Sequence, residues 1–283
     1  MRIPRFDPHS LAPLLLAGLL CLADAATARD GRFRAEYLAT ENEQYLAWEQ
    51  ELRQERLLED LAKDLNQVVR IPRDVTLSFG ECGQPNAFYD SEARRVTLCY
   101  ELLESFHERF GDETEDPEEL ENAVAGATVF VLFHELGHAL VDVLDLPVTG
   151  REEDAVDQLA AYVLIDGSDE GAQSALDAAW SFYFNTEEGA SEIDASAFWD
   201  EHSMNAQRFY NLMCWVYGAD PDGHQHLVDE ELLPPERAAR CPDEWAQLDR
   251  AWTQLLGPHI KEKDAAESEI PSGGGARKKK YGG

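Results

Sequence analysis

The order of apolar and polar positions along the chain predicts a mostly helical protein with a few short strands. From Arg34 to about Val69, apolar residues recur three and four positions apart among charged ones, which predicts one long amphipathic helix. Alternation predicts a strand at Val75–Phe79 and, after it, a hairpin whose polar turn is Asp90–Glu92. Helical periodicity predicts five more helices, at Glu119–Leu144, Glu152–Ile165, Ala172–Phe184, Phe198–Tyr217 and Asp243–Leu256. We therefore expect an α+β fold, mostly helical, in one domain.

The first residues have the order of a secretory signal peptide. Arg2 and Arg5 precede an apolar run, Leu11–Ala23, and A-x-A sites follow that end at Ala25 or Ala28. That order is typical of a cleaved leader. The alternative is an uncleaved anchor helix, although the run is short for a membrane span. We expect export to the periplasm or the medium, and no stable membrane insertion after cleavage.

The predicted boundaries are a signal peptide at 1–28, a folded domain at 29–258 and a tail at 259–283. The tail is rich in glycine and charge and low in apolar residues, so we expect it to be disordered. After the leader, no segment is expected to be apolar enough to cross a bilayer.

The formal net charge of −32 makes nucleic acids and anionic membranes poor partners. It also disfavours the approach of acidic substrates by long-range steering, unless a local patch of the surface differs.

Four cysteines remain once the leader is removed, and an even number in an exported protein predicts disulfides. Three pairings are possible, and proximity in the sequence favours Cys82–Cys99 with Cys214–Cys241. The alternative is buried free thiols.

The stretch "VLFHELGHAL" places two histidines and a glutamate in an apolar run. His134 and His138 are four residues apart, so on a helix both imidazoles project from one face. This is the H-E-x-x-H arrangement, in which the imidazoles bind zinc and Glu135 acts on water. The apolar flanks predict a buried helix, where unpaired polar groups would be costly.

A catalytic zinc site needs a third protein ligand, which the next predicted helix can supply in "TGREEDAVDQL". Thr149 and Glu152 are spaced as a capping box. Glu153 is then free to bind the metal, and Asp157, one turn later, can support a ligand histidine. Glu152 and Asp154 are rival ligands, because helix starts are uncertain by one or two residues.

"HELGH" followed by "EEDAVD" resembles the gluzincin metallopeptidases, the thermolysin-like clan. The short spacing and the upstream hairpin are more similar to the prenyl-protease and heat-shock membrane peptidases of that clan. "FHELGHALVDVLDLP", "GREEDAVDQLAAY" and "FWDEHSMNAQRFYNLMCWVYG" resemble most of all a bacterial family of exported metallopeptidases of unknown function, over Arg34–Leu256. The resemblance implies a zincin-like fold, with the helix pair carrying zinc and a neighbouring strand holding the substrate backbone.

The resemblance and the spacing imply one mechanism. Zn²⁺ held by His134, His138 and Glu153 would lower the pKa of its water toward about 7. Glu135 would take that proton and pass it to the leaving amine. The expected activity is therefore hydrolysis of peptides or proteins by a zinc metallopeptidase.

In related enzymes a downstream His, Tyr or Arg stabilises the negative charge on the carbonyl oxygen. His202 is the first candidate here, on an expected helical stripe with Ala206 and Phe209, followed by Arg208 and Tyr210. A histidine that only packs between helices is the alternative for His202.

Three further interpretations stay open at this point. His224 and His226 could be a second metal pair, but a surface loop is favoured because no third ligand is nearby. Val96–Cys99 could pair with an extended peptide as an edge strand. The protein could also be a catalytically silent, metal-bound binding module of the cell envelope, which the intact Glu135 disfavours. Oligomeric state and substrate preference cannot be predicted from the sequence.

Overall fold

The computed structural model describes residues 30–184 and 198–261. The predicted signal peptide lies outside the described residues, so the predicted leader stays a prediction. The same holds for the tail from residue 262 onward. Residues 259–261, which the prediction assigned to the tail, pack on the domain: Ile260 forms a β-bridge with Val69, and Lys261 Nζ donates to the carbonyl oxygen of Asn66 at 2.7 Å.

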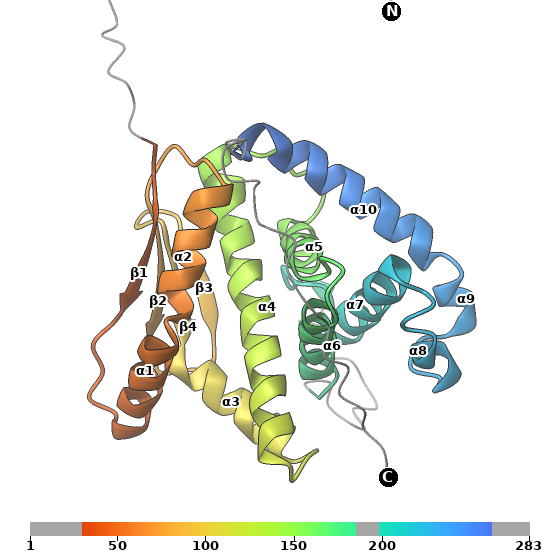
Figure 1. Ribbon diagram of the computed structural model, residues 1–283, viewed down its shortest axis with the longest axis horizontal. Helices are drawn as coiled ribbons and strands as arrows, with labels where there is room; N and C mark the ends of the chain where they lie inside the picture. Colours follow the sequence, from red (N-terminus) through yellow and green to blue (C-terminus); the bar gives the residue numbers. More distant parts are fainter. Residues whose placement is uncertain (1–29, 185–197, 262–283) are drawn as a thin grey trace, which may run out of the picture.

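A mixed four-stranded sheet forms one side of the molecule (Figure 1). Its strands are β1 (Phe33–Tyr37), β2 (Val75–Gly80), β3 (Ala87–Asp90) and β4 (Arg95–Cys99), in the order β1-β2-β4-β3. The first two pairings are parallel, and β3 pairs antiparallel with β4, as the predicted hairpin requires. The prediction of an edge strand at Val96–Cys99 is wrong: β4 lies between β2 and β3, and the two edge strands are β1 and β3.

The long helix predicted from Arg34 is wrong in its first part. Phe33–Tyr37 is a strand because its two end residues are buried against the core and its backbone pairs with β2. The helical segment that follows is divided into α1 (Glu43–Glu55) and α2 (Leu57–Val68). Arg56 separates them in the left-handed conformation, with a φ of 61°. Tertiary pairing therefore overrides the helical pattern at this end of the chain.

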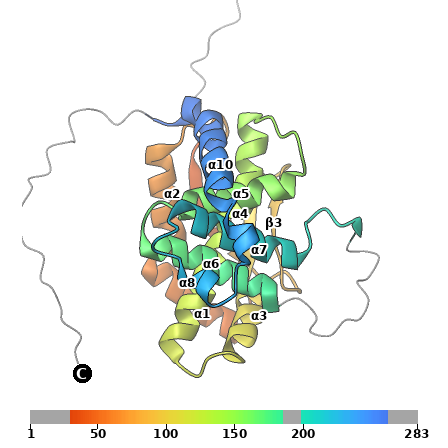
Figure 2. The same ribbon diagram turned by 90° about the vertical axis from the view of Figure 1, so that its right-hand side faces the viewer.

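The remaining regular elements of the described chain are helical. They are α3 (Tyr100–Gly111), α4 (Pro117–Leu144), α5 (Glu152–Leu164), α6 (Asp169–Phe184), α7 (Asn205–Ala219), α8 (His226–Asp229), α9 (Pro235–Ala238), α10 (Cys241–Leu256) and the 3₁₀ turn η2 (Gly257–His259). α4 lies between the sheet and the layer of helices that contains α5, α6 and α7 (Figure 1). α10 packs on α7 and α5 from the outside (Figure 2). The fold is α+β and mostly helical, as predicted.

α4 is the central element of the core. Asp116 caps its start by accepting the backbone N–H of Glu118, and Pro117 occupies the first turn. By length and composition alone α4 could cross a membrane, and 67% of its most apolar window is buried inside the fold. The expectation that no segment after the leader is apolar enough is therefore wrong. The apolar surface of α4 contacts the sheet and α3 as well as α5 and α6.

Both predicted disulfides are present. Cys82–Cys99 joins the loop before β3 to the end of β4. Cys214–Cys241 joins α7 to the first residue of α10. These bonds agree with an oxidising compartment.

Candidate metal centre

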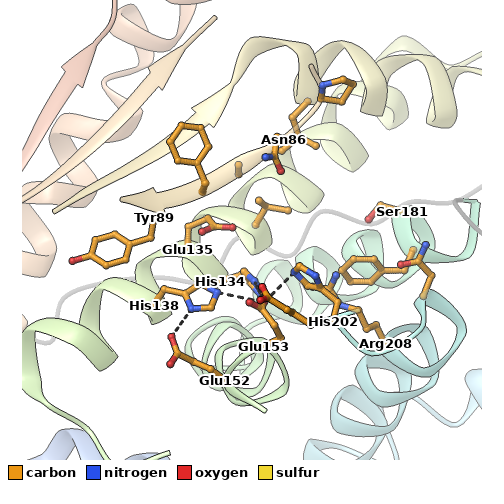
Figure 3. Close-up of a pocket in the computed structure, with 18 of the residues that line it drawn as sticks. Asn86, Tyr89, His134, Glu135, His138, Glu152, Glu153, Ser181, His202 and Arg208 are labelled. Atoms are coloured by element: carbon orange, nitrogen blue, oxygen red, sulfur yellow. Dashed lines mark hydrogen bonds and ion pairs between the residues drawn. The ribbon is translucent and has the colours of Figure 1, made fainter. Parts of the chain in front are cut away.

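Three predicted ligand side chains meet between α4 and α5 (Figure 3). His134 and His138 project from one face of α4 toward Glu153 in the first turn of α5. Glu153 Oε2 lies 3.1 Å from His134 Nε2 and 3.4 Å from His138 Nε2. Candidate ligand atoms of the three residues all lie within 4.8 Å of one another. The arrangement thus brings two imidazoles and a carboxylate to one point.

These donors fit a zinc ion by type and by spacing. Zinc commonly takes two histidines and a carboxylate in catalytic sites. Ligand atoms about 2 Å from a tetrahedral ion lie about 3.3 Å from each other. The two nitrogen–oxygen distances of 3.1 and 3.4 Å lie on either side of that value. The residues present therefore suit the metal that the sequence pattern implies.

A glycine in the motif allows α5 to approach α4 this closely. A Cβ atom on Gly137 would lie 2.8 Å from the Cβ of Val156 and 3.3 Å from a methyl carbon of Leu159. Both distances are shorter than an ordinary carbon–carbon contact. The absence of a side chain at this position therefore brings Glu153 within reach of the histidines.

A second carboxylate supports each of the two histidines. Asp157 Oδ1 lies 2.8 Å from His134 Nδ1, and Glu152 Oε1 lies 2.7 Å from His138 Nδ1. Such contacts orient the ring and select the tautomer that directs Nε2 toward a metal. The predicted supporting role of Asp157 stays a prediction, with this contact in its favour. The predicted use of Glu152 in a capping box with Thr149 is wrong.

The register of α5 explains that error. The residue before its first turn is Arg151, whose side chain makes no capping hydrogen bond, so Thr149 lies too early to cap the helix. Glu152 is therefore free to contact His138. In the sequence, the contact is indicated only by the position of Glu152 directly before the predicted ligand Glu153. The other rival ligand, Asp154, accepts a hydrogen bond from Ser203 Oγ at 2.6 Å.

Asp157 is held from its other side by Arg208 of α7. Arg208 donates from Nε to Asp157 Oδ2 and from Nη2 to Oδ1, both at 2.7 Å. Burial would raise the pKa of Asp157, but the Arg208 guanidinium and His134 lower it to about 2. Burial would likewise lower the pKa of His134, whereas hydrogen bonds to Asp157 and Glu153 raise it to about 9. The sequence offered no signal for this Arg208–Asp157 pair.

His202 also reaches the centre, although not from a helix. Its Nε2 lies 3.0 Å from Glu153 Oε2, and Arg151 Nη1 donates to its carbonyl oxygen at 3.0 Å. The predicted helix at Phe198–Tyr217 starts only at Asn205, so the expected helical stripe for His202 is wrong. Its side chain nevertheless comes to the ligands from the turn before α7. Tyr210, the third candidate for that role, is 42% exposed and does not line the cleft.

Glu135 lies beside the two histidines and faces a cleft of about 720 Å³ (Figure 3). The β3 segment forms one wall of the cleft, and the starts of α5 and α7 form the opposite wall. Glu135 is only 8% exposed, and burial raises the pKa of its carboxyl above the ordinary range. A carboxylate in this position can accept a proton from water in the cleft.

The other histidine pair makes no comparable site. The rings of His224 and His226 are 5.9 Å apart, and His224 Nδ1 contacts the carbonyl oxygen of Asp220. Within the described residues, neither histidine belongs to a cluster of three possible metal ligands. His224 lies in a turn, as predicted, whereas His226 is the first residue of the short helix α8, so the predicted loop is correct only for His224.

A family model described as "Putative metallopeptidase" (DUF4344) matches residues 37–256. The chain belongs to this family. The match spans the sheet from the end of β1 and every helix through α10. No curated protein and no solved structure matches the chain. Membership supports a metal-dependent peptidase acting on peptides or proteins, and the His134–His138–Glu153 cluster supplies a place for the metal.

Proposed function

We propose that this DUF4344 protein is an exported zinc-dependent peptidase whose metal is bound by His134, His138 and Glu153. The observation that carries the proposal is the convergence of three donor atoms on one point, with a supporting carboxylate behind each histidine. When bound, Zn²⁺ supplies a Lewis acid that makes water nucleophilic at neutral pH.

Glu135 is the proposed general base. Its carboxylate faces the cleft next to the ligand cluster, so it can take a proton from the attacking water. After attack on the carbonyl carbon, the same carboxyl returns the proton to the leaving amine. Burial raises the pKa of this carboxyl, which makes it a stronger base toward water than an exposed glutamate.

His202 is proposed to donate a hydrogen bond to the carbonyl oxygen as negative charge develops there. It is the nearest imidazole to the cluster besides the two ligands within the described residues, and it lines the cleft. Arg208 is an alternative only in part, because Asp157 accepts two of its N–H groups.

The edge strand β3 is proposed to hold an extended substrate. β3 pairs with β4 on one side only, and its residues Ala87, Phe88 and Tyr89 line the cleft. A peptide added to this edge would gain backbone hydrogen bonds and pass in front of Glu135. Export itself is supported by the leader-like N-terminus and the two disulfides.

The decisive test is the Glu135→Gln variant in zinc-reconstituted protein. It should keep about one zinc per chain, because no ligand is lost, and should lose hydrolysis of an unfolded, fluorescence-quenched peptide library. Glu121→Gln, an exposed position on the same helix, is the matched control and should retain both. Full activity in Glu135→Gln would refute the assigned base.

The same experiment addresses the silent binding module. Wild-type protein that binds zinc stoichiometrically and hydrolyses nothing would favour that alternative. The His202→Ala variant distinguishes two roles of His202, a fourth metal ligand and a catalytic hydrogen-bond donor. For the catalytic role we expect unchanged zinc content and a lower kcat. Loss of zinc in His202→Ala would make it a ligand instead.

A further inference from the structure

The cleft continues past the metal centre along one face of α3. Leu102, Phe106 and Arg109 line it at spacings of four and three residues, so they form a single stripe on that helix. Val131, one turn before His134 on α4, faces the same part of the cleft. This part of the cleft therefore has apolar walls along the stripe, which ends at the guanidinium of Arg109.

Arg109 differs from the other arginine that lines the cleft within the described residues. Arg208 donates two hydrogen bonds to Asp157, whereas no described carboxylate forms an ion pair or hydrogen bond with Arg109. Burial lowers the pKa of Arg109, and only the neighbouring Glu108 opposes that effect. Within residues 30–184 and 198–261, Arg109 is thus a half-buried cation without a paired anion, in a chain that has 56 acidic and 24 basic residues.

The opposite end of the cleft carries the opposite charge. Asp142 lies on α4 about two turns beyond His134, on the side away from Val131, and accepts a hydrogen bond from Tyr89 of the edge strand. Glu152 and Glu201 line the cleft as well, beside His138. An acidic group on a bound peptide would be repelled from that end and attracted to Arg109. The charge distribution therefore gives an extended peptide a preferred direction in the cleft.

We propose that Arg109 binds a carboxylate of the peptide substrate, with an apolar side chain between that carboxylate and the scissile bond. The inference rests on the proposed function. The planar guanidinium can donate two parallel hydrogen bonds to a carboxylate. The intervening apolar side chain packs against Leu102, Phe106 and Val131. Such a local cation overcomes the general repulsion that the negative net charge imposes on acidic peptides.

A carboxylate could come from the C-terminus of the peptide or from an Asp or Glu side chain. Two sets of matched peptides distinguish these sources. One set pairs a free C-terminal acid with its amide, and the other pairs Glu with Gln at the second or third position from the cleaved bond. Each pair has the same sequence otherwise, with Leu next to the cleaved bond.

The experiment measures kcat/KM for both members of each pair with zinc-loaded wild type, Arg109→Gln, Arg109→Lys and Arg250→Gln. Wild type should prefer the acidic member of at least one set by about 10- to 100-fold, the range of a hydrogen bond between charged groups. The ratio should fall to about one in Arg109→Gln and be partly kept in Arg109→Lys, which has the charge without the fork. Arg250→Gln, on the outer helix α10, should keep the wild-type ratio.

Binding gives a readout that does not depend on turnover. In zinc-loaded Glu135→Gln protein, the Kd of the acidic peptide should be lower than that of its neutral partner, and adding Arg109→Gln should abolish the difference. Equal hydrolysis of both members by wild type, or a preference that persists in Arg109→Gln, overturns the inference and leaves the proposed function intact. If zinc-loaded wild type hydrolyses no peptide in either set and binds none, both proposals fail.

Discussion

Replacing Gly137 by alanine tests whether the close approach of α4 and α5 assembles the metal centre. The added methyl group would lie 2.8 Å from the Cβ of Val156. That atom is next to the backbone of α5 and cannot rotate away. The clash can therefore be relieved only by moving one helix away from the other, and Glu153 moves with α5.

The size of that movement follows from contact distances. Carbon atoms pack at about 3.5–4.0 Å, so α5 must shift by roughly 1 Å. Zinc–ligand distances vary by only about 0.2 Å in working sites. The movement is therefore large enough to pull Glu153 out of bonding range, and we expect zinc affinity to fall by about 10- to 100-fold. Overpacking should lower the free energy of unfolding by about 1–3 kcal/mol, and the better helix propensity of alanine should offset about 1 kcal/mol of that loss.

A second glycine on α4 supplies the control. A Cβ on Gly126 would press on the Asp177 side chain of α6, 3.0 Å from its Cβ, in a contact that does not involve α5. Gly126→Ala should thus destabilise the protein by a similar amount and leave zinc binding unchanged. Zinc affinity is measured by competition with a chromophoric chelator, and stability by urea unfolding of metal-free protein. If Gly137→Ala binds zinc as tightly as wild type, the helix approach does not set the ligand geometry.

Three further predictions concern groups around the centre and the core. Asp157→Asn should lower zinc affinity by about 10- to 100-fold in the same competition assay, because His134 loses its orienting carboxylate; unchanged affinity would mean that His134 is oriented without it. Burial raises the pKa of Asp177 to about 6 from 3.8, so the folded state holds the proton more tightly and stability falls as pH rises from about 4 to about 6. Asp177→Asn should remove that fall and raise the free energy of unfolding at pH 7 by about 1–2 kcal/mol, after allowance for solvent screening. Urea unfolding at several pH values measures this, and a pH profile like that of wild type would contradict the assignment. Tyr89 donates a hydrogen bond to Asp142 Oδ2 at 2.6 Å, so Tyr89→Phe should lower the free energy of unfolding by about 1 kcal/mol. It should also raise the KM of extended peptides several-fold with zinc content unchanged. An unaltered KM would argue against β3 as the strand that binds substrate.

The sequence predicted the parts of the fold that depend on local pattern. The hairpin, α4, α5 and α10 follow from periodicity and turn residues, and they are present within a few residues of the expected bounds. The break at Arg56 has no glycine or proline to announce it. The strand at Phe33–Tyr37 exists because it pairs with β2, some forty residues later. The non-local pairing of β4 with β2 also decides that β3, and not β4, is an edge strand.

In the candidate site, too, the sequence predicted what depends on local spacing and missed what depends on tertiary structure. His134, Glu135 and His138 follow from spacing on one helix, and Glu153 with Asp157 follows from spacing on the next. The contact between Glu152 and His138 depends on where α5 starts, which sequence patterns fix only to within one or two residues. The approach of His202 depends on the path of an irregular segment before α7, for which no periodic signal exists.

The Cys82–Cys99 bond has a consequence for self-digestion. It joins two residues that are 17 positions apart in the sequence, and the loop between them contains all of β3, the extended segment that lines the cleft with Glu135. A peptidase can cut itself when such a segment detaches and enters another molecule's cleft, and the rate follows the population of the detached form. A crosslink around a loop of about this length removes roughly 3 kcal/mol of chain entropy from detached states. On the proposed function, the bond would protect the strand that borders the cleft in an oxidising compartment, and a reducing compartment would expose that strand to cleavage by other copies.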